Sequence, residues 1–131
     1  MKRPLLRALA VALLPVLAGS HAFGANADAP VTAPGDAEHG KQIYQACMAC
    51  HSIDEDDVGP RHRGVFGRVA GTVPGYAYSP ALRNSGITWD AANLDRWLSN
   101  PQGLVPGAKM FFALRDARDR ADVIAYLAGL H

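Results

Sequence analysis

The sequence predicts an all-α fold in which three to five helices are joined by long loops. Residues that commonly start helices recur along the chain, at Asp36, Ser79, Asp90 and Asp116. Between residues 52 and 78 glycine and proline are frequent, and no alternation of apolar and polar residues persists there. Loops of this length have little reason to be ordered unless they wrap around another object.

The first predicted helix covers residues 37–49 and begins after Asp36, which follows a Pro-Gly pair. Gly40 and Tyr44 lie four residues apart in this helix, so they share one of its faces. A glycine on that face permits a second helix to approach closely.

Three further helices are predicted downstream, and each is bounded by residues that start or stop helices. They begin after Ser79, Asp90 and Asp116 and end at Gly86, Asn100-Pro101 and Gly129. Apolar residues at helical spacing mark the faces that should be buried. These are Leu94, Trp97 and Leu98 in the third helix, and Val123, Ile124, Tyr126 and Leu127 in the last.

The most informative segment is the pentapeptide Cys47-Met48-Ala49-Cys50-His51. Cys-x-x-Cys-His is the attachment motif of a c-type haem, in which two thiols add to the haem vinyl groups and the histidine is placed to ligate the iron. The alternatives are half of a zinc site, a redox dithiol and an ordinary disulfide. A zinc site needs about four ligands, and the sequence holds no second cluster of them. A redox dithiol is expected near a β-α-β pattern, whereas this pair ends a helical segment.

The second iron ligand is sought among methionine and histidine, the usual partners in haems that transfer electrons. Met48 lies inside the attachment motif and cannot reach the opposite face of the iron. Because Met1 leaves with the N-terminal segment, Met110 is the remaining methionine, and its alternative interpretation is a core residue. His62 and His39 are competing candidates, although His62 lies between two arginines and is expected in a solvated basic patch.

Residues 1–27 have the pattern of a cleaved secretory signal peptide, in which cationic residues precede an apolar run too short to span a bilayer. Small residues put the cleavage boundary at 24–27. Residues 28–34 then form a disordered leader, and residues 35–131 form one domain. The signal peptide carries three cationic and no acidic side chains, so its removal changes the formal charge from +1 to −2 and argues against a nucleic-acid partner.

The motifs of this chain, taken in order, resemble those of class I cytochromes c of the mitochondrial type and its small bacterial counterparts. The resemblance covers nearly all of residues 35–131. Besides the attachment motif, it rests on Gly40-x-x-x-Tyr44, Gly59-Pro60, Gly64-Val65-Phe66-Gly67-Arg68, Pro74-Gly75-Tyr76-Ala77-Tyr78, Gly86-Ile87-Thr88-Trp89, Asn100-Pro101, Pro106-Gly107-x-Lys109-Met110 and the stretch from Arg120 to Leu127.

This resemblance implies the cytochrome c fold and one haem c attached covalently to Cys47 and Cys50. It implies that His51 and Met110 are the axial ligands of the iron, and that the carbonyl of Pro60 accepts the other ring proton of His51. Arg68, Tyr78 and Trp89 resemble the family's donors to the haem propionates, and Trp97 would lie against the haem beside the methionine. The first and last helices would cross where Gly40 and Tyr44 pack on Val123 and Tyr126.

Two positions depart from the family pattern. Trp97 stands where the family usually has a tyrosine whose hydroxyl approaches the methionine sulfur. Ala108 stands where a threonine hydroxyl commonly helps to close the haem crevice. Because both changes remove a polar group beside the ligand loop, we expect them to tune the reduction potential.

The function implied by the resemblance is that of a soluble monohaem electron carrier in the periplasm. Protein ligands would fill both axial positions, so no enzymatic activity is expected. We expect a monomer, without a membrane span once the signal peptide is removed, that binds a redox donor and a redox acceptor transiently. The alternatives are an electron-donating haem subunit of one enzyme complex, and a haem protein with a labile sixth ligand that acts as a peroxidase or binds gases.

Overall fold

The structure is a computed structural model that describes residues 34–131. The predicted signal peptide and most of the predicted leader lie outside the described residues. The all-α prediction is confirmed, because the described residues form no β-structure beyond one isolated bridge between Val69 and Thr88. The helices are α1 (Ala37–Ile43), the 3₁₀ helix η1 (Tyr44–Ala49), α2 (Pro80–Arg83), α3 (Ala91–Ser99), α4 (Pro101–Leu104) and α5 (Ala117–Ala128).

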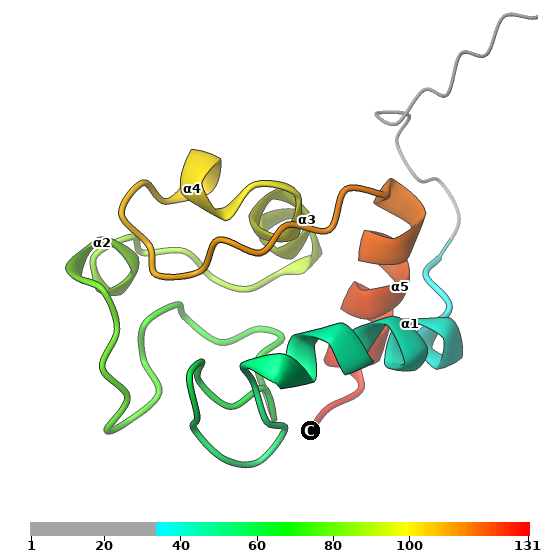
Figure 1. Cartoon of the computed structure of the whole chain (residues 1–131), viewed down its shortest axis with the longest axis horizontal. Helices are drawn as coiled ribbons and strands as arrows, with labels where there is room; N and C mark the ends of the chain where they lie inside the picture. Colours follow the sequence, from blue (N-terminus) through cyan, green and yellow to red (C-terminus); the bar gives the residue numbers. More distant parts are fainter. Residues whose placement is uncertain (1–33) are drawn as a thin grey trace, which may run out of the picture.

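Helices α1 and α5 cross at one end of the molecule, and they form the most extensive helix pair in the described part of the chain. Figure 1 shows α3 and α4 next to each other above this crossing, and α2 on the far side of the molecule. The long green loop that follows η1 closes the fold below. No helix among residues 34–131 has the length and apolar character needed to cross a membrane.

The first helix begins as predicted but tightens before it ends. The Asp36 carboxylate caps α1 by accepting hydrogen bonds from two backbone N–H groups of the first turn. At Tyr44 the α-helix changes into the 3₁₀ helix η1, which continues to Ala49. Tighter turns of this kind are common at helix ends, and the predicted helix over residues 37–49 is therefore two successive elements.

Gly40 makes the crossing of α1 and α5 possible. A Cβ atom at this position would lie 1.9 Å from the carbonyl oxygen of Asp122, and the backbone nitrogen of Val123 is nearly as close. One turn later the ring of Tyr44, which is 1 % exposed, packs on Tyr126 with 5.1 Å between ring centroids. The helix pairing implied by the family resemblance is thus present in the structure.

A buried carboxylate also joins the start of α1 to α5. Asp122 is 1 % exposed, and it accepts hydrogen bonds from the backbone N–H of Asp36 at 2.7 Å and from Nδ1 of His39 at 2.8 Å. Nε of Arg118 lies 3.2 Å from the same carboxylate. Burial alone raises the pKa of Asp122, but the contacts with His39, Asp36 and Arg118 outweigh it and lower that pKa below its ordinary value.

Helix α3 ends as predicted, and α4 is an element that the sequence analysis missed. The predicted apolar face of α3 is buried at Leu94, Trp97 and Leu98. Asn100 stops α3, but its side chain also accepts a hydrogen bond from the backbone N–H of Gly103 and thereby caps α4. A proline after a cap is favourable at the first position of a helix, so one Asn-Pro pair ends one helix and begins the next.

The long loop before α2 is held to the segment that follows α2. The backbone N–H of Gly67 donates to the carbonyl of Trp89 at 2.9 Å, and that of Ala70 donates to Ile87 at 2.7 Å. Gly67 has φ of +83°, a conformation that L side chains rarely adopt. These bonds bring Trp89 and the loop to the same side of the fold.

Candidate functional site

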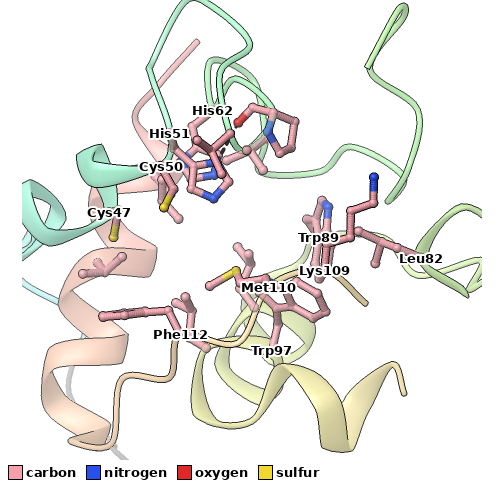
Figure 2. A pocket seen from close by; sticks show the side chains of 18 of the residues that line it. Cys47, Cys50, His51, His62, Leu82, Trp89, Trp97, Lys109, Met110 and Phe112 are labelled. Atoms are coloured by element: carbon pink, nitrogen blue, oxygen red, sulfur yellow. Dashed lines mark hydrogen bonds between the residues drawn. The ribbon is translucent and has the colours of Figure 1, made fainter. Parts of the chain in front are cut away.

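A cavity of about 310 Å³ lies between the attachment motif and the segment that follows α4. Its walls are mainly apolar, with a small number of polar groups. Figure 2 shows Cys47, Cys50 and His51 on one side and Met110 with Trp97 on the other. His39, a competing ligand candidate, does not line this cavity. Every residue that the family resemblance assigns to the haem site does: Cys47, Cys50, His51, Pro60, Arg68, Tyr78, Trp89, Trp97 and Met110.

The two cysteines are free thiols at the edge of the cavity. Cys47 is half-buried and Cys50 is exposed, and neither forms a disulfide. The backbone N–H groups of Cys50 and His51 both donate to the carbonyl of Cys47, so the motif folds into a compact turn. Burial raises the pKa of the Cys47 thiol above its ordinary value. The geometry thus presents both sulfurs, and the following histidine, to one cavity.

His51 is held in one tautomer by its neighbours. Its Nδ1 donates a hydrogen bond to the carbonyl of Pro60 at 2.7 Å, which leaves the lone pair on Nε2. Burial lowers the pKa of His51, and the bond to Pro60 opposes that change in part. A Cβ atom at Gly59 would lie 2.2 Å from Cε1 of His51, so this glycine makes room for the ring. The result is a fixed imidazole with a nitrogen available to a metal ion.

Met110 approaches the cavity from the opposite wall (Figure 2). It is half-buried and belongs to the extended segment between α4 and α5. The ammonium group of Lys109 donates to the carbonyl of Ala77 at 2.6 Å, which joins this segment to the loop before α2. A thioether is thus directed at the same space as the His51 ring, from the other side.

His62 corrects a prediction, because it does not lie in a solvated basic patch. Its ring stacks on that of His51, with 4.0 Å between centroids, and its Nδ1 lies 2.9 Å from the hydroxyl of Tyr44. Burial, with smaller contributions from His51 and Arg68, lowers the pKa of His62 to about 3. Figure 2 shows His62 on the His51 side of the cavity, away from Met110. The ring therefore supports His51 and does not compete with Met110.

The polar wall of the cavity is formed by Arg68 and two tyrosines. Arg68 is half-buried, and its guanidinium donates to the carbonyls of Arg61 at 2.9 Å and Arg63 at 3.1 Å. Tyr78 and Tyr76 line the same wall, and their rings make an edge contact at 4.7 Å between centroids. The Tyr76 hydroxyl already donates to the carbonyl of Val58, so the Arg68 cation and the Tyr78 hydroxyl are the groups that suit the carboxylates of a bound group.

Trp97 and Ala108, the two departures from the family pattern, are both buried. The Trp97 ring is 7 % exposed and packs on Trp89, with 5.2 Å between centroids. Ala108 is 3 % exposed, and its carbonyl accepts a hydrogen bond from the side chain of Gln102. Trp97 lines the cavity, so the wall on the methionine side is more apolar there than a tyrosine would make it, whereas Ala108 is buried in the core and does not line the cavity.

Comparison with known proteins assigns the chain to a family. The family model for cytochrome c matches residues 37–131, which include every residue of the cavity wall. The chain belongs to the cytochrome c family. The resemblance seen in the sequence motifs is thereby confirmed.

Relatives of this family member come from bacteria and eukaryotes. Cytochrome c2 of Rhodomicrobium vannielii is 48 % identical over 103 residues, which are 76 % of this chain and 82 % of that protein. Cytochrome c of Euglena viridis is 46 % identical over 100 residues, which are 73 % of this chain and 98 % of that protein. Cytochrome cH from Methylobacterium extorquens has a similar structure, with a TM-score of 0.70, 46 % identity, and coverage of 72 % of this chain and 98 % of that one.

This family member carries one covalent haem c at the attachment motif that contains Cys47 and Cys50. The chain's own residues fit that group: two free thiols, an imidazole with an available nitrogen and a mainly apolar cavity. The zinc alternative finds no support in residues 34–131, where no three His, Cys, Asp or Glu residues are grouped as a metal site.

Sequence reasoning missed several residues that shape the site. Gly59 was noticed as a loop and family residue, but not as the neighbour that admits the His51 ring. The arginine neighbours of His62 favour an exposed position, whereas its ring is half-buried between His51 and Tyr44. Gln102 carried no signal at all, because its partners lie in the loop after α4.

Proposed function

We propose that this cytochrome c family member is a one-electron carrier whose haem iron is ligated by His51 and Met110. The observation that carries the proposal is their position on opposite walls of one cavity (Figure 2). The bound haem supplies a one-electron couple, and a thioether paired with an imidazole raises its potential relative to harder ligands. If His51 and Met110 both ligate the iron, no open position would be left on it for a substrate.

The chain's residues would hold this arrangement still during electron transfer. The carbonyl of Pro60 keeps the His51 proton on Nδ1 and so would hold the orientation of the ring. Trp89 and Trp97 are each 7 % exposed and exclude water from the wall beside Met110. Arg68, Tyr78 and Trp89 would donate to the haem propionates, since all three line the cavity and the backbone N–H of Trp89 donates to the carbonyl of Arg68 at 2.9 Å.

We also propose that the protein works in the periplasm. The pattern of residues 1–27 supports export, and the bacterial relative from Rhodomicrobium vannielii is a cytochrome c2. Mass spectrometry of the exported protein should give a mature chain beginning between residues 25 and 28, with one haem added. Its partners would be a redox donor and acceptor that bind in turn, as electron carriers require weak and short-lived contacts.

The axial ligation is tested with Met110→Ala in the haem-bound protein. Ferric haem with a thioether ligand shows a weak near-infrared charge-transfer band, which wild type should have and Met110→Ala should lack. Met48→Ala is the matched control, because Met48 is half-exposed inside the attachment motif and should leave the band unchanged. A wild type without the band, or a Met110→Ala variant that keeps it, would contradict the proposed ligand.

A further inference from the structure

Gln102 makes three hydrogen bonds to the segment that ends in Met110. Its side-chain nitrogen Nε2 donates to the carbonyl of Ala108 at 2.8 Å and to that of Met110 at 2.9 Å. Its oxygen Oε1 accepts from the backbone N–H of Gly107 at 3.3 Å. One amide therefore binds both ends of the turn from Gly107 to Met110.

Few other hydrogen bonds hold this turn, although the Ala108 side chain is buried in the core. The N–H of Ala108 donates to the carbonyl of Val105 at 3.0 Å, and Lys109 reaches the carbonyl of Ala77. Within residues 34–131 the carbonyl of Met110 accepts no hydrogen bond other than that from Gln102. The side chain of Ala108 is a methyl group, so it adds no hydrogen bond of its own.

Gln102 is well placed to act as an anchor. It sits in α4, whose start is fixed by the Asn100 cap and by Pro101 at the first helical position. Its side chain is half-buried, which reduces competition from water for the three bonds. The hydrogen bonds of Gln102 thus connect the turn that carries Met110 to α4.

We propose that Gln102 is a positioning residue that keeps Met110 on the haem iron by clamping this turn. The proposal rests on the axial role of Met110 given above. An external ligand such as imidazole can bind only when Met110 has left the iron. The apparent affinity for imidazole is therefore the intrinsic affinity multiplied by the fraction of molecules in which Met110 has left the iron. Removing the clamp raises that fraction without changing the iron's other ligand.

The test is an imidazole titration of the ferric, haem-bound protein. Gln102→Leu removes all three hydrogen bonds at nearly constant volume. Gln102→Glu keeps the shape but puts an oxygen against the two carbonyls. Because one side-chain hydrogen bond is worth roughly a factor of ten in an equilibrium, both variants should bind imidazole about tenfold or more tightly than wild type. Gln45→Leu is the matched control, since Gln45 donates only to the exposed carbonyl of Lys41 in the preceding turn.

The near-infrared band of each ferric protein distinguishes a failure of the Met110 ligand assignment from a failure of the Gln102 clamp. If wild type has the band and both Gln102 variants bind imidazole like wild type and Gln45→Leu, the clamp is wrong and the ligand assignment stands. If wild type lacks the band, the ligand assignment fails, and the clamp fails with it. Tighter imidazole binding in both Gln102 variants, with a wild-type band in the absence of imidazole, supports the clamp.

Discussion

The hydroxyl of Tyr44 shares a hydrogen bond of 2.9 Å with Nδ1 of His62, and this bond connects the helix crossing to the haem cavity. Tyr44 packs on Tyr126 of α5 on one side and on the His62 ring on the other, with centroids 5.1 and 5.7 Å apart. His62 in turn stacks on His51. A continuous series of ring contacts thus joins the crossing of α1 and α5 to the His51 imidazole in the cavity.

The first prediction concerns this buried polar pair. Tyr44→Phe and His62→Leu each leave one buried polar partner unsatisfied, so each should lower the free energy of unfolding by about 1–3 kcal/mol. The double variant removes both partners and should cost less than the sum of the two single changes. Guanidinium denaturation of the four haem-bound proteins, followed by haem absorption, measures the coupling. Strictly additive costs would show that the two groups do not depend on each other.

The second prediction is that Gly40→Ala destabilises the crossing of α1 and α5. The added Cβ would lie 1.9 Å from the carbonyl oxygen of Asp122, so the helices must separate. Overpacking of this kind costs about 1–3 kcal/mol. Gly129→Ala is the matched control, because φ is −85° there and the nearest atom to a new Cβ is 3.4 Å away. Equal denaturation midpoints for both variants would contradict the close approach.

The third prediction is a pH dependence of stability that arises from His39 and Asp122. The hydrogen bond to Asp122 raises the pKa of His39 above 6.5, so its stabilising contribution is complete below that value and is lost as pH rises through the higher, folded pKa. The pKa of Asp122 is lowered below 3.8, so its contribution is present above that value and is lost as pH falls through the folded pKa.

Denaturation midpoints measured from pH 3 to pH 9 test this pair. The difference between wild type and His39→Gln should be largest on the acid side of the folded His39 pKa and should shrink as pH rises through it. His131→Gln is the matched control, because His131 is exposed and is not part of the contact with Asp122. A wild-type pH profile in His39→Gln would show that the contact with Asp122 contributes nothing.

The fourth prediction concerns the two apolar departures near Met110. Trp97→Tyr adds a hydroxyl to the cavity wall, and Ala108→Thr adds one to the buried start of the segment that carries Met110. A hydrogen bond at either position contributes about 0.5–1.5 kcal/mol. A tenfold change in equilibrium corresponds to about 59 mV for one electron, so the potential should shift by at most some tens of millivolts. Protein-film voltammetry should show reversible couples in both variants. Loss of reversibility in either would mean that the position does more than tune the potential.

Local signals in the sequence predicted the helices well, because a cap acts within one turn. Asp36, Ser79, Asp90 and Asp116 all cap helices in the structure. The Asn100-Pro101 pair was ambiguous for the same reason, since the same two residues can end one helix and start another. Capping residues therefore predict where a helix begins more reliably than they predict the number of helices.

Long-range contacts explain what the sequence could not predict. The arginines on both sides of His62 favour an exposed position for it, but the ring between them contacts Tyr44 from another element and is half-buried. Gln102 likewise gains its role from the folded turn at Met110. In contrast, the attachment motif is contiguous in sequence, and so its chemistry could be predicted from the sequence alone.

Ligation of the haem iron by both His51 and Met110 distinguishes the proposed electron carrier from a haem protein with a labile sixth position. The most direct measurement is the absorption spectrum of the reduced wild-type protein before and after addition of carbon monoxide, with reduced Met110→Ala as the positive control. We expect no change in wild type at neutral pH and formation of a carbon monoxide complex in Met110→Ala. Rapid and complete binding of carbon monoxide by wild type would contradict it and would indicate a labile sixth position.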